Sequence, residues 1–297
     1  MKIVISGGTG FIGEALVRDL AGAHEVVVLS RSPGRVRVGR GVGWDASPGG
    51  AWEGELGDAG AVVNLAGESI GEGRWTEKKK RALVESRLNA TRALVGAMRA
   101  RPREGRVLVS ASAIGYYGDR GDEVLEESSP PGDDFLARLC RQWENEAREA
   151  ESVGRVVITR FGIVLGRDGG ALPRMALPVR LFVGGRVGSG EQWMSWVHRR
   201  DLVRLVRWAI ERRDASGVYN VAAPNPVKNR ELIAVLASVL HRPAIFPAPA
   251  FALRIALGEM ADALLLSSQR VVPRRASIEQ FTFDFPDLKR ALRDIYS

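Results

Sequence analysis

Short apolar runs and longer amphipathic stretches alternate along most of the chain. The apolar runs predict buried strands at residues 2–6, 25–30, 61–65, 106–110, 156–160 and 218–221. Between them, apolar residues recur at helical spacing, which predicts helices after residue 11 and over 76–100, 133–151 and 200–212. Repeated strand and helix units with such apolar strands are typical of a parallel sheet covered on both faces. We therefore predict an α/β fold with a doubly wound parallel sheet of the Rossmann type.

The pattern changes after Gly166, where a stretch rich in Gly and Pro begins. A further helix is predicted from Asn229, which can cap it, and the end of the chain is predicted to be mostly helical. We expect a dinucleotide-binding domain over 1–167, continued by 196–226. Residues 168–195 and 227–297 are expected to form a smaller, mostly helical lobe on the substrate side.

Three glycines, Gly7, Gly10 and Gly13, lie between the first strand and the first helix. Strand, glycine loop, helix and strand together form a βαβ unit. In that context the missing side chains let the backbone approach a pyrophosphate, and the helix N-terminus offers free N–H groups to it. The loop predicts a dinucleotide site, and the alternative is a glycine-rich turn without a ligand.

The end of the second strand indicates which dinucleotide binds. NAD-binding proteins place Asp or Glu there to hold the ribose hydroxyls, whereas this chain has Ser30 and Arg31. A guanidinium group suits a 2′-phosphate, so we predict NADP as the cofactor. The alternative is that Arg31 is simply a surface residue of an arginine-rich chain.

Composition excludes several classes of protein. The chain has 297 residues, of which 45% are hydrophobic and 26% charged, and this excludes a disordered or fibrous protein. The net charge of +8 comes mainly from dispersed arginines, which favours a compositional bias over a nucleic-acid surface. The single cysteine, Cys140, and three widely separated histidines offer no metal-ligand spacing. No apolar run is long enough to span a membrane and no signal peptide is evident, so we expect a cytoplasmic protein without a membrane partner.

Two motifs resemble the extended short-chain dehydrogenase/reductase superfamily, namely the loop from Gly7 to Gly13 and the run Asn64-Leu65-Ala66-Gly67. Further motifs narrow the resemblance to an atypical epimerase family of nucleoside-diphosphate-sugar epimerases, whose members end in a domain of unknown function similar to the stretch from about Pro249. These motifs are Gly67-Glu68-Ser69-Ile70, Gly73-Arg74-Trp75, Ser86-Arg87, Gly115-Tyr116-Tyr117-Gly118, Trp143-Glu144, the run from Arg160 to Gly166, Gly188-Ser189-Gly190, Trp196-Val197-His198 and the run from Tyr219 to Pro224.

The resemblance implies a cofactor site assembled from several strand ends. It assigns pyrophosphate contacts to Gly7, Thr9, Gly10, Phe11 and Ile12, adenosine phosphate contacts to Ser30 and Arg31, adenine and ribose contacts to Leu65 and Ala66, and further cofactor contacts to Arg87 and Val164. Glu68 and His198 are expected near a small-molecule substrate of the nucleotide-sugar class. A homodimer through the helices at 76–100 and 133–151 is also implied.

One feature of the superfamily is absent. Its usual Tyr-x-x-x-Lys pair, in which lysine lowers the pKa of tyrosine, is not found in this chain. The corresponding helix offers Phe135 and Leu139, or Leu136 and Cys140, in those positions. Candidate proton donors are instead the hydroxyl groups that follow the predicted strand at 106–110, on Ser112, Tyr116 and Tyr117.

Three hypotheses follow from this departure. The chain is an NADP-dependent enzyme with an unusual proton donor, or a non-catalytic sensor of NADP(H) or a nucleotide-sugar, or a nucleic-acid-associated protein. Structural alternatives also stand for two residues. His198 is equally expected as a packed structural residue, and Cys140, on the inward stripe of its helix, is expected as a small core residue more than as a nucleophile.

Overall fold

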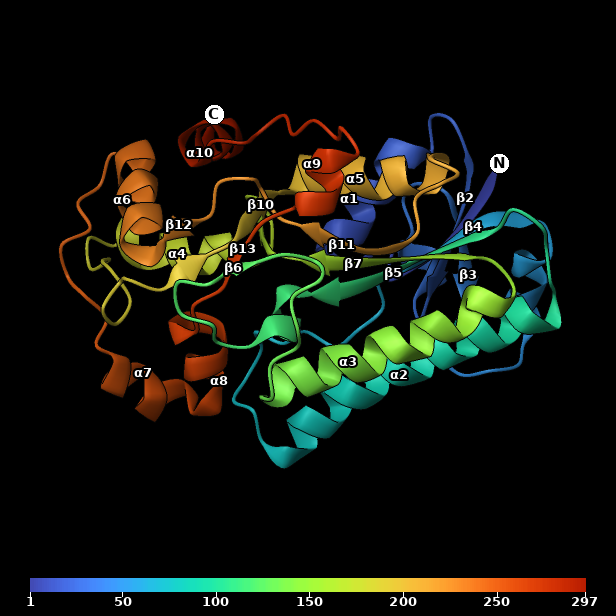
Figure 1. Ribbon diagram of the computed structural model, residues 1–297, viewed down its shortest axis with the longest axis horizontal. Helices are drawn as coiled ribbons and strands as arrows, with labels where there is room; N and C mark the ends of the chain where they lie inside the picture. Colours follow the sequence, from blue (N-terminus) through green and yellow to red (C-terminus); the bar gives the residue numbers. More distant parts are fainter.

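A seven-stranded parallel sheet forms the centre of the molecule (Figure 1), in a computed structural model that describes residues 1–297. The strand order is β11-β7-β5-β4-β1-β2-β3, and every neighbouring pair is parallel. The strands are β1 (Lys2–Ser6), β2 (Glu25–Ser30), β3 (Arg40–Gly43), β4 (Ala59–Asn64), β5 (Val107–Ala113), β7 (Arg155–Phe161) and β11 (Gly217–Val221). The predicted doubly wound α/β fold is confirmed. The hydrophobic pattern does not predict β3, because this edge strand has two glycines and no apolar run.

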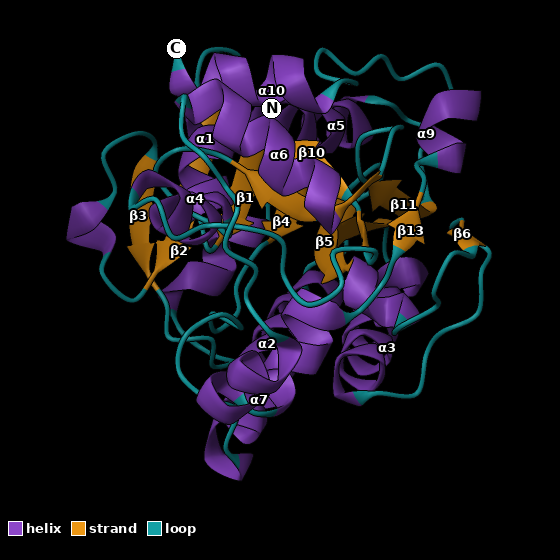
Figure 2. Ribbon diagram, turned by 90° about the vertical axis from the view of Figure 1, so that its left-hand side faces the viewer, coloured by secondary structure: helices purple, strands orange, loops and turns teal.

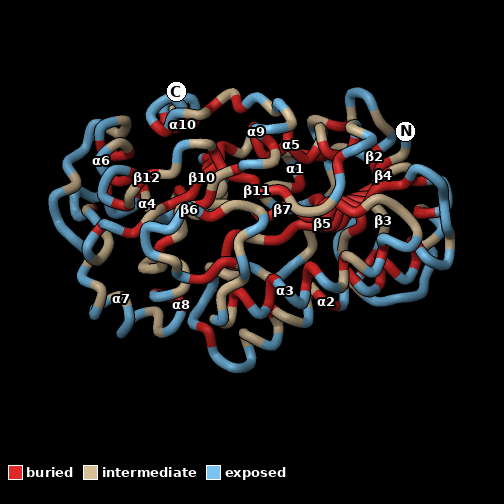
Figure 3. The backbone as a smooth tube through the Cα atoms, in the orientation of Figure 1, coloured by how far each residue is buried: buried red, intermediate tan, exposed pale blue.

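Two helical layers cover the sheet (Figure 2). Helices α1 (Phe11–Leu20) and α5 (Arg199–Glu211) pack on one face, and α2 (Glu77–Ala100) and α3 (Phe135–Arg148) pack on the other. Alternate residues of each strand enter the two cores, so that Ile3 and Ile5 face α1 while Val4 faces α2. The buried residues follow the sheet through the molecule (Figure 3).

Polar side chains fix the ends of these helices. Thr76 accepts the backbone N–H of Lys79 at 3.2 Å and starts α2, and Asp134 accepts that of Ala137 at 2.8 Å and starts α3. At the other end of α2, the fully buried guanidinium of Arg106 donates to the carbonyl oxygens of Leu56, Ala59 and Arg101. Its positive charge lies at the negative end of the helix dipole, which favours this arrangement.

A second lobe follows β7 and lies at one end of the molecule (Figure 1). Its helices are α4 (Leu172–Arg180), α6 (Asn229–Leu240), α7 (Ala250–Leu257) and the three-residue α8 (Glu259–Ala261), and its strands are β8 (Ile163–Leu165), β9 (Trp193–Met194), β10 (Trp196–His198) and β12 (Val227–Lys228). Asn229 does not cap α6 as predicted. It is the first helical residue, and its side-chain oxygen accepts the N–H of Val187 at 2.8 Å.

The chain then returns to the first domain, which the predicted lobe of 227–297 did not anticipate. Strand β13 (Arg270–Val271) pairs with β6 (Val124–Leu125), and helix α9 (Arg274–Ile278) packs beside β11. Ala276 and Phe283 join the core between the sheet and α1 and α5. The buried carboxylate of Asp201 accepts the N–H groups of residues 284 and 285 at 2.8 and 2.9 Å. Only then does α10 (Leu288–Tyr296) pack on α6 in the second lobe.

None of the helices combines the length and apolar character that a bilayer crossing requires.

Candidate dinucleotide site

The loop after β1 lies where the strand order reverses. From β1 the chain moves to β2 and β3 on one side and returns to β4 on the other, so the crevice in which such sheets bind ligands is expected at the carboxyl ends of β1 and β4. Gly7, at a φ of +71°, packs so closely on the turn after β4 that an added Cβ would lie 2.7 Å from the carbonyl carbon of Leu65. Gly8 and Gly13 are enclosed in the same way, by Val28 and by the backbone of Gly7.

The glycines therefore have two different roles. Gly7, Gly8 and Gly13 are required by the protein's own packing, whereas Thr9 and Gly10 lie exposed at the tip of the loop. Gly10 precedes α1 in an extended conformation, and no side chain caps the helix. The N–H groups of the first turn of α1 are thus available to an anion at the tip, as pyrophosphate binding requires.

The end of β2 presents a free cation. Arg31 is exposed and makes no hydrogen bond or ion pair, while the hydroxyl of Ser30 accepts the N–H of Ser32 at 3.1 Å. The Glu68 carboxylate accepts the ammonium group of Lys79 at 2.8 Å, and this contact lowers the pKa of Glu68, with smaller contributions from the charges of Arg31 and Arg87. Three cations therefore surround one carboxylate, which makes this edge electropositive.

Arg87 is held within the protein. Its guanidinium donates to the carbonyl oxygens of Leu83 and Glu68, both at 3.0 Å, and lies against Gly67 and the ring of Trp143. Burial lowers its pKa. Arg87 thus supports the loop after β4 from inside the protein, through its hydrogen bond to the Glu68 carbonyl oxygen.

A buried hydrogen-bond network, not foreseen from the sequence, supports Leu65 and Ala66. Ser6 donates to Asn64 at 2.8 Å, Asn64 donates to Thr91 at 2.9 Å, and Trp143 donates to the same Thr91 hydroxyl at 3.0 Å. This network joins β1, β4, α2 and α3 directly below the crevice. Leu65 and Ala66 are half-buried at its upper edge.

Two of the three predicted proton donors are not accessible. Ser112 is buried and donates to Glu144 at 2.7 Å, and Tyr117 is fully buried and donates to Asn220 at 2.7 Å. Burial raises the pKa of Tyr117 to about 12. The geometry therefore does not support the catalytic roles expected for Ser112 and Tyr117, because the protein already engages both hydroxyls. Tyr116 alone of the three is partly exposed.

A buried ion pair between Glu144 and Arg160 engages the hydroxyls of Ser112 and Tyr117, and the sequence patterns did not predict it. Arg160 donates to both oxygens of Glu144, at 2.8 and 2.9 Å, and to the Tyr117 hydroxyl at 2.9 Å. Its guanidinium also stacks on the ring of Tyr116 at 3.3 Å. A signal for the pair exists, since Glu144 follows Cys140 by one turn on the inward stripe of its helix and Arg160 ends an apolar strand.

One of the two candidate registers for the missing Tyr-x-x-x-Lys pair, Leu136 with Cys140, is packed in the core. Leu136 contacts the turn after β5, where an added Cβ on Gly115 would lie 3.2 Å from the Leu136 Cβ. Cys140 is buried one turn further, and burial raises the pKa of its thiol to about 12. Neither residue offers a proton at neutral pH.

Phe11 closes the other side of the glycine loop. Its ring fits against three glycines that follow β8, at positions 166, 169 and 170, where an added Cβ would approach the ring to between 2.6 and 2.9 Å. Arg199 stacks on the opposite side at 4.7 Å and pairs with Asp168 at 2.7 Å. Ile12 and Val164 are half-buried in the same region.

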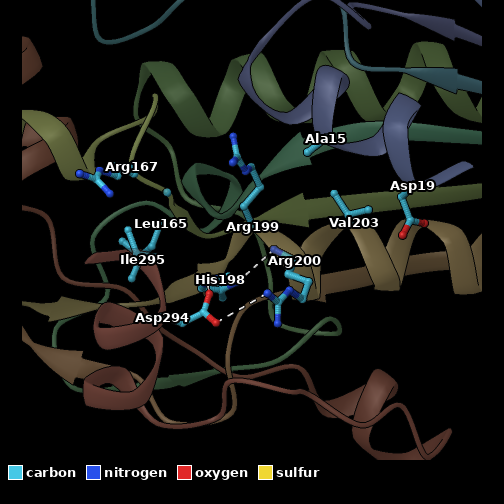
Figure 4. Close-up of a pocket in the computed structure, with 11 residues that line it drawn as sticks. Ala15, Asp19, Leu165, Arg167, His198, Arg199, Arg200, Val203, Asp294 and Ile295 are labelled. Carbon is cyan, nitrogen blue, oxygen red and sulfur yellow. Dashed lines mark hydrogen bonds and ion pairs between the residues drawn. The ribbon is translucent and has the colours of Figure 1, made fainter. Parts of the chain in front are cut away.

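His198 lies opposite Leu165, next to Val164, because β10 pairs with β8, but the protein itself engages its ring. Its Nδ1 accepts the N–H of Arg200 at 3.1 Å and so caps α5, its ring stacks on Phe285 at 4.0 Å, and its Nε2 lies 3.3 Å from Asp294. It lines a hollow of about 350 Å³ on the outer side of α1, α5 and α10 (Figure 4). Burial lowers the pKa of His198 to about 4. Its contacts support a role in capping α5, and not the predicted contact with a substrate.

Comparison with known proteins gives a consistent result. The family model "NAD dependent epimerase/dehydratase family" matches residues 3–222, and a domain of unknown function matches residues 248–295. Epimerase family protein YfhF of Bacillus subtilis is 40% identical over 99% of this chain and 98% of its own. The chloroplastic SDR39U1 homolog of Arabidopsis thaliana is 42% identical over 99% of this chain and 86% of its own. The crystal structure of human epimerase family protein SDR39U1 with NADPH aligns with a TM-score of 0.91 and 36% identity, over 99% of both chains.

Proposed function

The chain belongs to the NAD dependent epimerase/dehydratase family, and from this premise we propose that it binds NADP(H) in the crevice between β1 and β4. The N-terminus of α1 and the exposed tip at Thr9 and Gly10 would hold the pyrophosphate, and Arg31 would hold the 2′-phosphate. The unpaired Arg31 at the end of β2 is the observation that carries the proposal. The NADPH complex of the human relative supports it.

The residues present fit this cofactor. An uncapped helix N-terminus suits the pyrophosphate charge, and a free guanidinium beside Glu68 and Lys79 suits a phosphate dianion. No carboxylate stands at the end of β2 to hold a ribose 2′-hydroxyl. Ser30 and Arg31 are therefore matched to the phosphorylated ribose.

For the reaction, we propose a slow hydride transfer on a small hydroxyl or carbonyl substrate of the nucleoside-diphosphate-sugar class. Bound NADPH would supply the hydride to a carbonyl group and solvent would supply the proton to the resulting alkoxide; in the other direction NADP+ would accept the hydride and solvent would take the hydroxyl proton. The protein contributes binding and orientation, because neither candidate register of the usual proton-transfer pair, Phe135 with Leu139 or Leu136 with Cys140, holds a tyrosine or a lysine. Tyr116, half-exposed beside the buried pair of Glu144 and Arg160, is the phenol available to donate a hydrogen bond to a developing oxyanion.

A second candidate is a sensor that binds NADP(H) without turnover. The burial of Ser112, Tyr117 and Cys140 favours it, because burial raises the pKa of Tyr117 and that of Cys140 to about 12 and the protein already engages the Ser112 hydroxyl. The two candidates share the cofactor site and differ in chemistry alone.

Titration calorimetry with NADPH and NADH tests the cofactor assignment. NADPH should bind at least about 10-fold more tightly, which corresponds to about 1.4 kcal/mol. Arg31→Ala should remove most of that preference by weakening NADPH binding alone. Arg141→Ala is the matched control, since Arg141 is equally exposed, forms no ion pair and lies on the outer side of α3. Equal affinities of the wild type for the two cofactors would contradict the assignment.

Turnover separates the enzyme from the sensor. The wild type and Tyr116→Phe are incubated with NADP(H) and a panel of nucleotide-sugars, and products and cofactor absorbance are followed. For the enzyme, Tyr116→Phe should lower the rate about 10-fold with unchanged NADPH affinity. Tight NADPH binding without turnover of any substrate would favour the sensor.

A further inference from the structure

Large exposed hydrophobic side chains gather in one part of the second lobe. Of the eleven in the whole chain, eight fall in two short stretches, and they are 52% to 73% exposed. We call these eight residues the apolar face: Leu177, Leu181, Phe182, Val183, Ile245, Phe246, Phe251 and Ile255. Single exposed apolar residues are ordinary, whereas a gathered set marks a contact surface.

The two stretches are joined through the backbone. The N–H of Phe246 donates to Gly184 at 3.0 Å, and that of Ala248 donates to Arg186 at 2.9 Å. Helix α7 begins two residues later, at the same end of the molecule as α4 (Figure 1). These hydrogen bonds place the segment that follows α4 beside the connector that leads into α7.

Helix α7 has no partner for its outer side. Its sequence is AFALRIAL, yet none of its eight residues is buried (Figure 3). Phe251 and Ile255 lie one turn apart on the same side of the helix and are 66% and 73% exposed. An apolar helix of this kind in water lacks the burial that normally stabilises it.

The two stretches that carry the apolar face contain positive charges only, while the neighbouring carboxylates of Glu231, Glu259 and Asp262 lie just outside them. Residues 169–190 and 232–258 contain no Asp or Glu. They contain five exposed arginines, at positions 174, 180, 186, 242 and 254. Of these, only Arg254 pairs with a carboxylate, that of Asp262 at 2.9 Å. Arg242 instead stacks on Phe182 of the face itself, at 5.0 Å.

We propose that the apolar face docks on the surface of a membrane that contains anionic lipid. Its aliphatic and aromatic side chains would enter the boundary of the acyl chains, and the arginines around them would meet the lipid phosphates. Such a helix lies on a bilayer and does not cross it, so the proposal needs no helix able to span. It replaces the expectation from the sequence that the protein has no membrane partner. It stands independently of the proposed NADP(H) function.

A second copy of the chain fits this surface less well. In a symmetric dimer the same patch meets itself, so the unpaired arginines of both copies would face one another. The helices that the family resemblance implies for a dimer, α2 and α3, have a charged outer surface, with Arg92 paired to Glu146 and Arg99 to Glu149. Excess positive charge beside apolar side chains matches an anionic amphiphilic partner.

Co-sedimentation with vesicles tests the proposal on the full chain. The probes are vesicles of phosphatidylcholine alone and of phosphatidylcholine mixed with an equal amount of phosphatidylglycerol. The wild type should sediment with the mixed vesicles and remain in solution with the neutral ones. Raised salt should weaken binding, because it screens the arginine–phosphate attraction.

Variants distinguish the face from the rest of the surface. The double variant Phe251→Asp with Ile255→Asp should lower the partition coefficient on the mixed vesicles at least about 10-fold. The double variant Arg186→Gln with Arg242→Gln should also bind the mixed vesicles more weakly, because it removes two of the charges that attract anionic lipid. Ile278→Asp is the matched control, because Ile278 is 65% exposed but lies on α9 outside the face, and it should bind like the wild type. Circular dichroism and the urea midpoint establish that each variant is folded.

Two results would overturn the proposal. One is a wild type that fails to sediment with the anionic vesicles. The other is equal binding by the control and the Phe251 and Ile255 variant, since the apolar face would then make no contribution. If light scattering also shows a concentration-dependent dimer that Leu181→Asp abolishes, the face belongs to an interface between copies.

Discussion

Replacing Glu144 with glutamine removes one charge of the buried pair and keeps the volume of the side chain. Arg160, 2% exposed, would retain the Tyr117 hydroxyl at 2.9 Å and the carbonyl of Glu127 at 3.3 Å, but no negative charge. Removing one partner of a buried ion pair costs about 3–5 kcal/mol. We therefore expect Glu144→Gln to destabilise the protein by that amount, which is a large part of the stability of most domains.

Removing the arginine of the pair should cost less stability than removing the carboxylate charge. In Arg160→Met the Glu144 carboxylate keeps the Ser112 hydroxyl at 2.7 Å and lies 3.4 Å from Arg148, a partly exposed cation able to approach it. The methionine also fills the space left by the arginine stem. We expect a loss smaller than that of Glu144→Gln by at least about 1 kcal/mol.

Urea unfolding followed by circular dichroism measures both losses as midpoint shifts. The matched control is Glu146→Gln, two residues along α3, where the pair with Arg92 is exposed and should contribute about 0–1 kcal/mol. If Glu144→Gln and Glu146→Gln lower stability equally, burial does not determine the strength of this pair, and the reasoning fails.

Two further predictions concern pH and packing. The pKa of His198 is lowered to about 4 in the folded protein, whereas its ordinary value is near 6.5. As the pH falls from 6.5 towards 4, the unfolded chain therefore binds the proton before the folded one does. The free energy of unfolding decreases over this range, by about 2 kcal/mol at pH ~5. His198→Asn retains the helix cap and should flatten the dependence of the urea midpoint on pH. Gly166→Ala would bring a methyl group within 2.6 Å of the Phe11 ring and should weaken NADPH binding about 10-fold in calorimetry. Gly96→Ala in α2, with open space around it, should leave binding unchanged and add up to about 1 kcal/mol of stability.

Local patterns predicted the sheet because each strand and helix carries its own periodicity. The apolar run before Gly7 and the uncapped helix after it identified the loop without tertiary information. The same approach failed for Ser112 and Tyr117. Their hydroxyls follow a strand end, where ligands bind in such folds, but their orientation depends on Glu144 and Arg160, which come from other elements.

The resemblance motifs contained more structural information than their spacing revealed. Tyr117, Glu144, Arg160 and Asn220 come from four separate motifs and meet in one buried network. Spacing along the chain does not show that distant polar residues satisfy one another inside a core. The sequence did not predict the role of His198 for a related reason, because Phe285 and Asp294 cover it from a segment near the end of the chain.

The return of residues 270–285 to the first domain has a consequence for how the protein is made. Phe283 packs into the same core as Ile3 and Ile5, and Asp201 binds the backbone of the segment beside it. During synthesis, β1 therefore cannot be completely buried until residues near the end of the chain, such as Phe283, have been added. Contacts between such distant parts of a chain slow folding and prolong the exposure of apolar strands. The apolar strands of the nascent N-terminal half therefore stay incompletely buried for most of synthesis, and a chain that ends before residue 270 would lack part of this core.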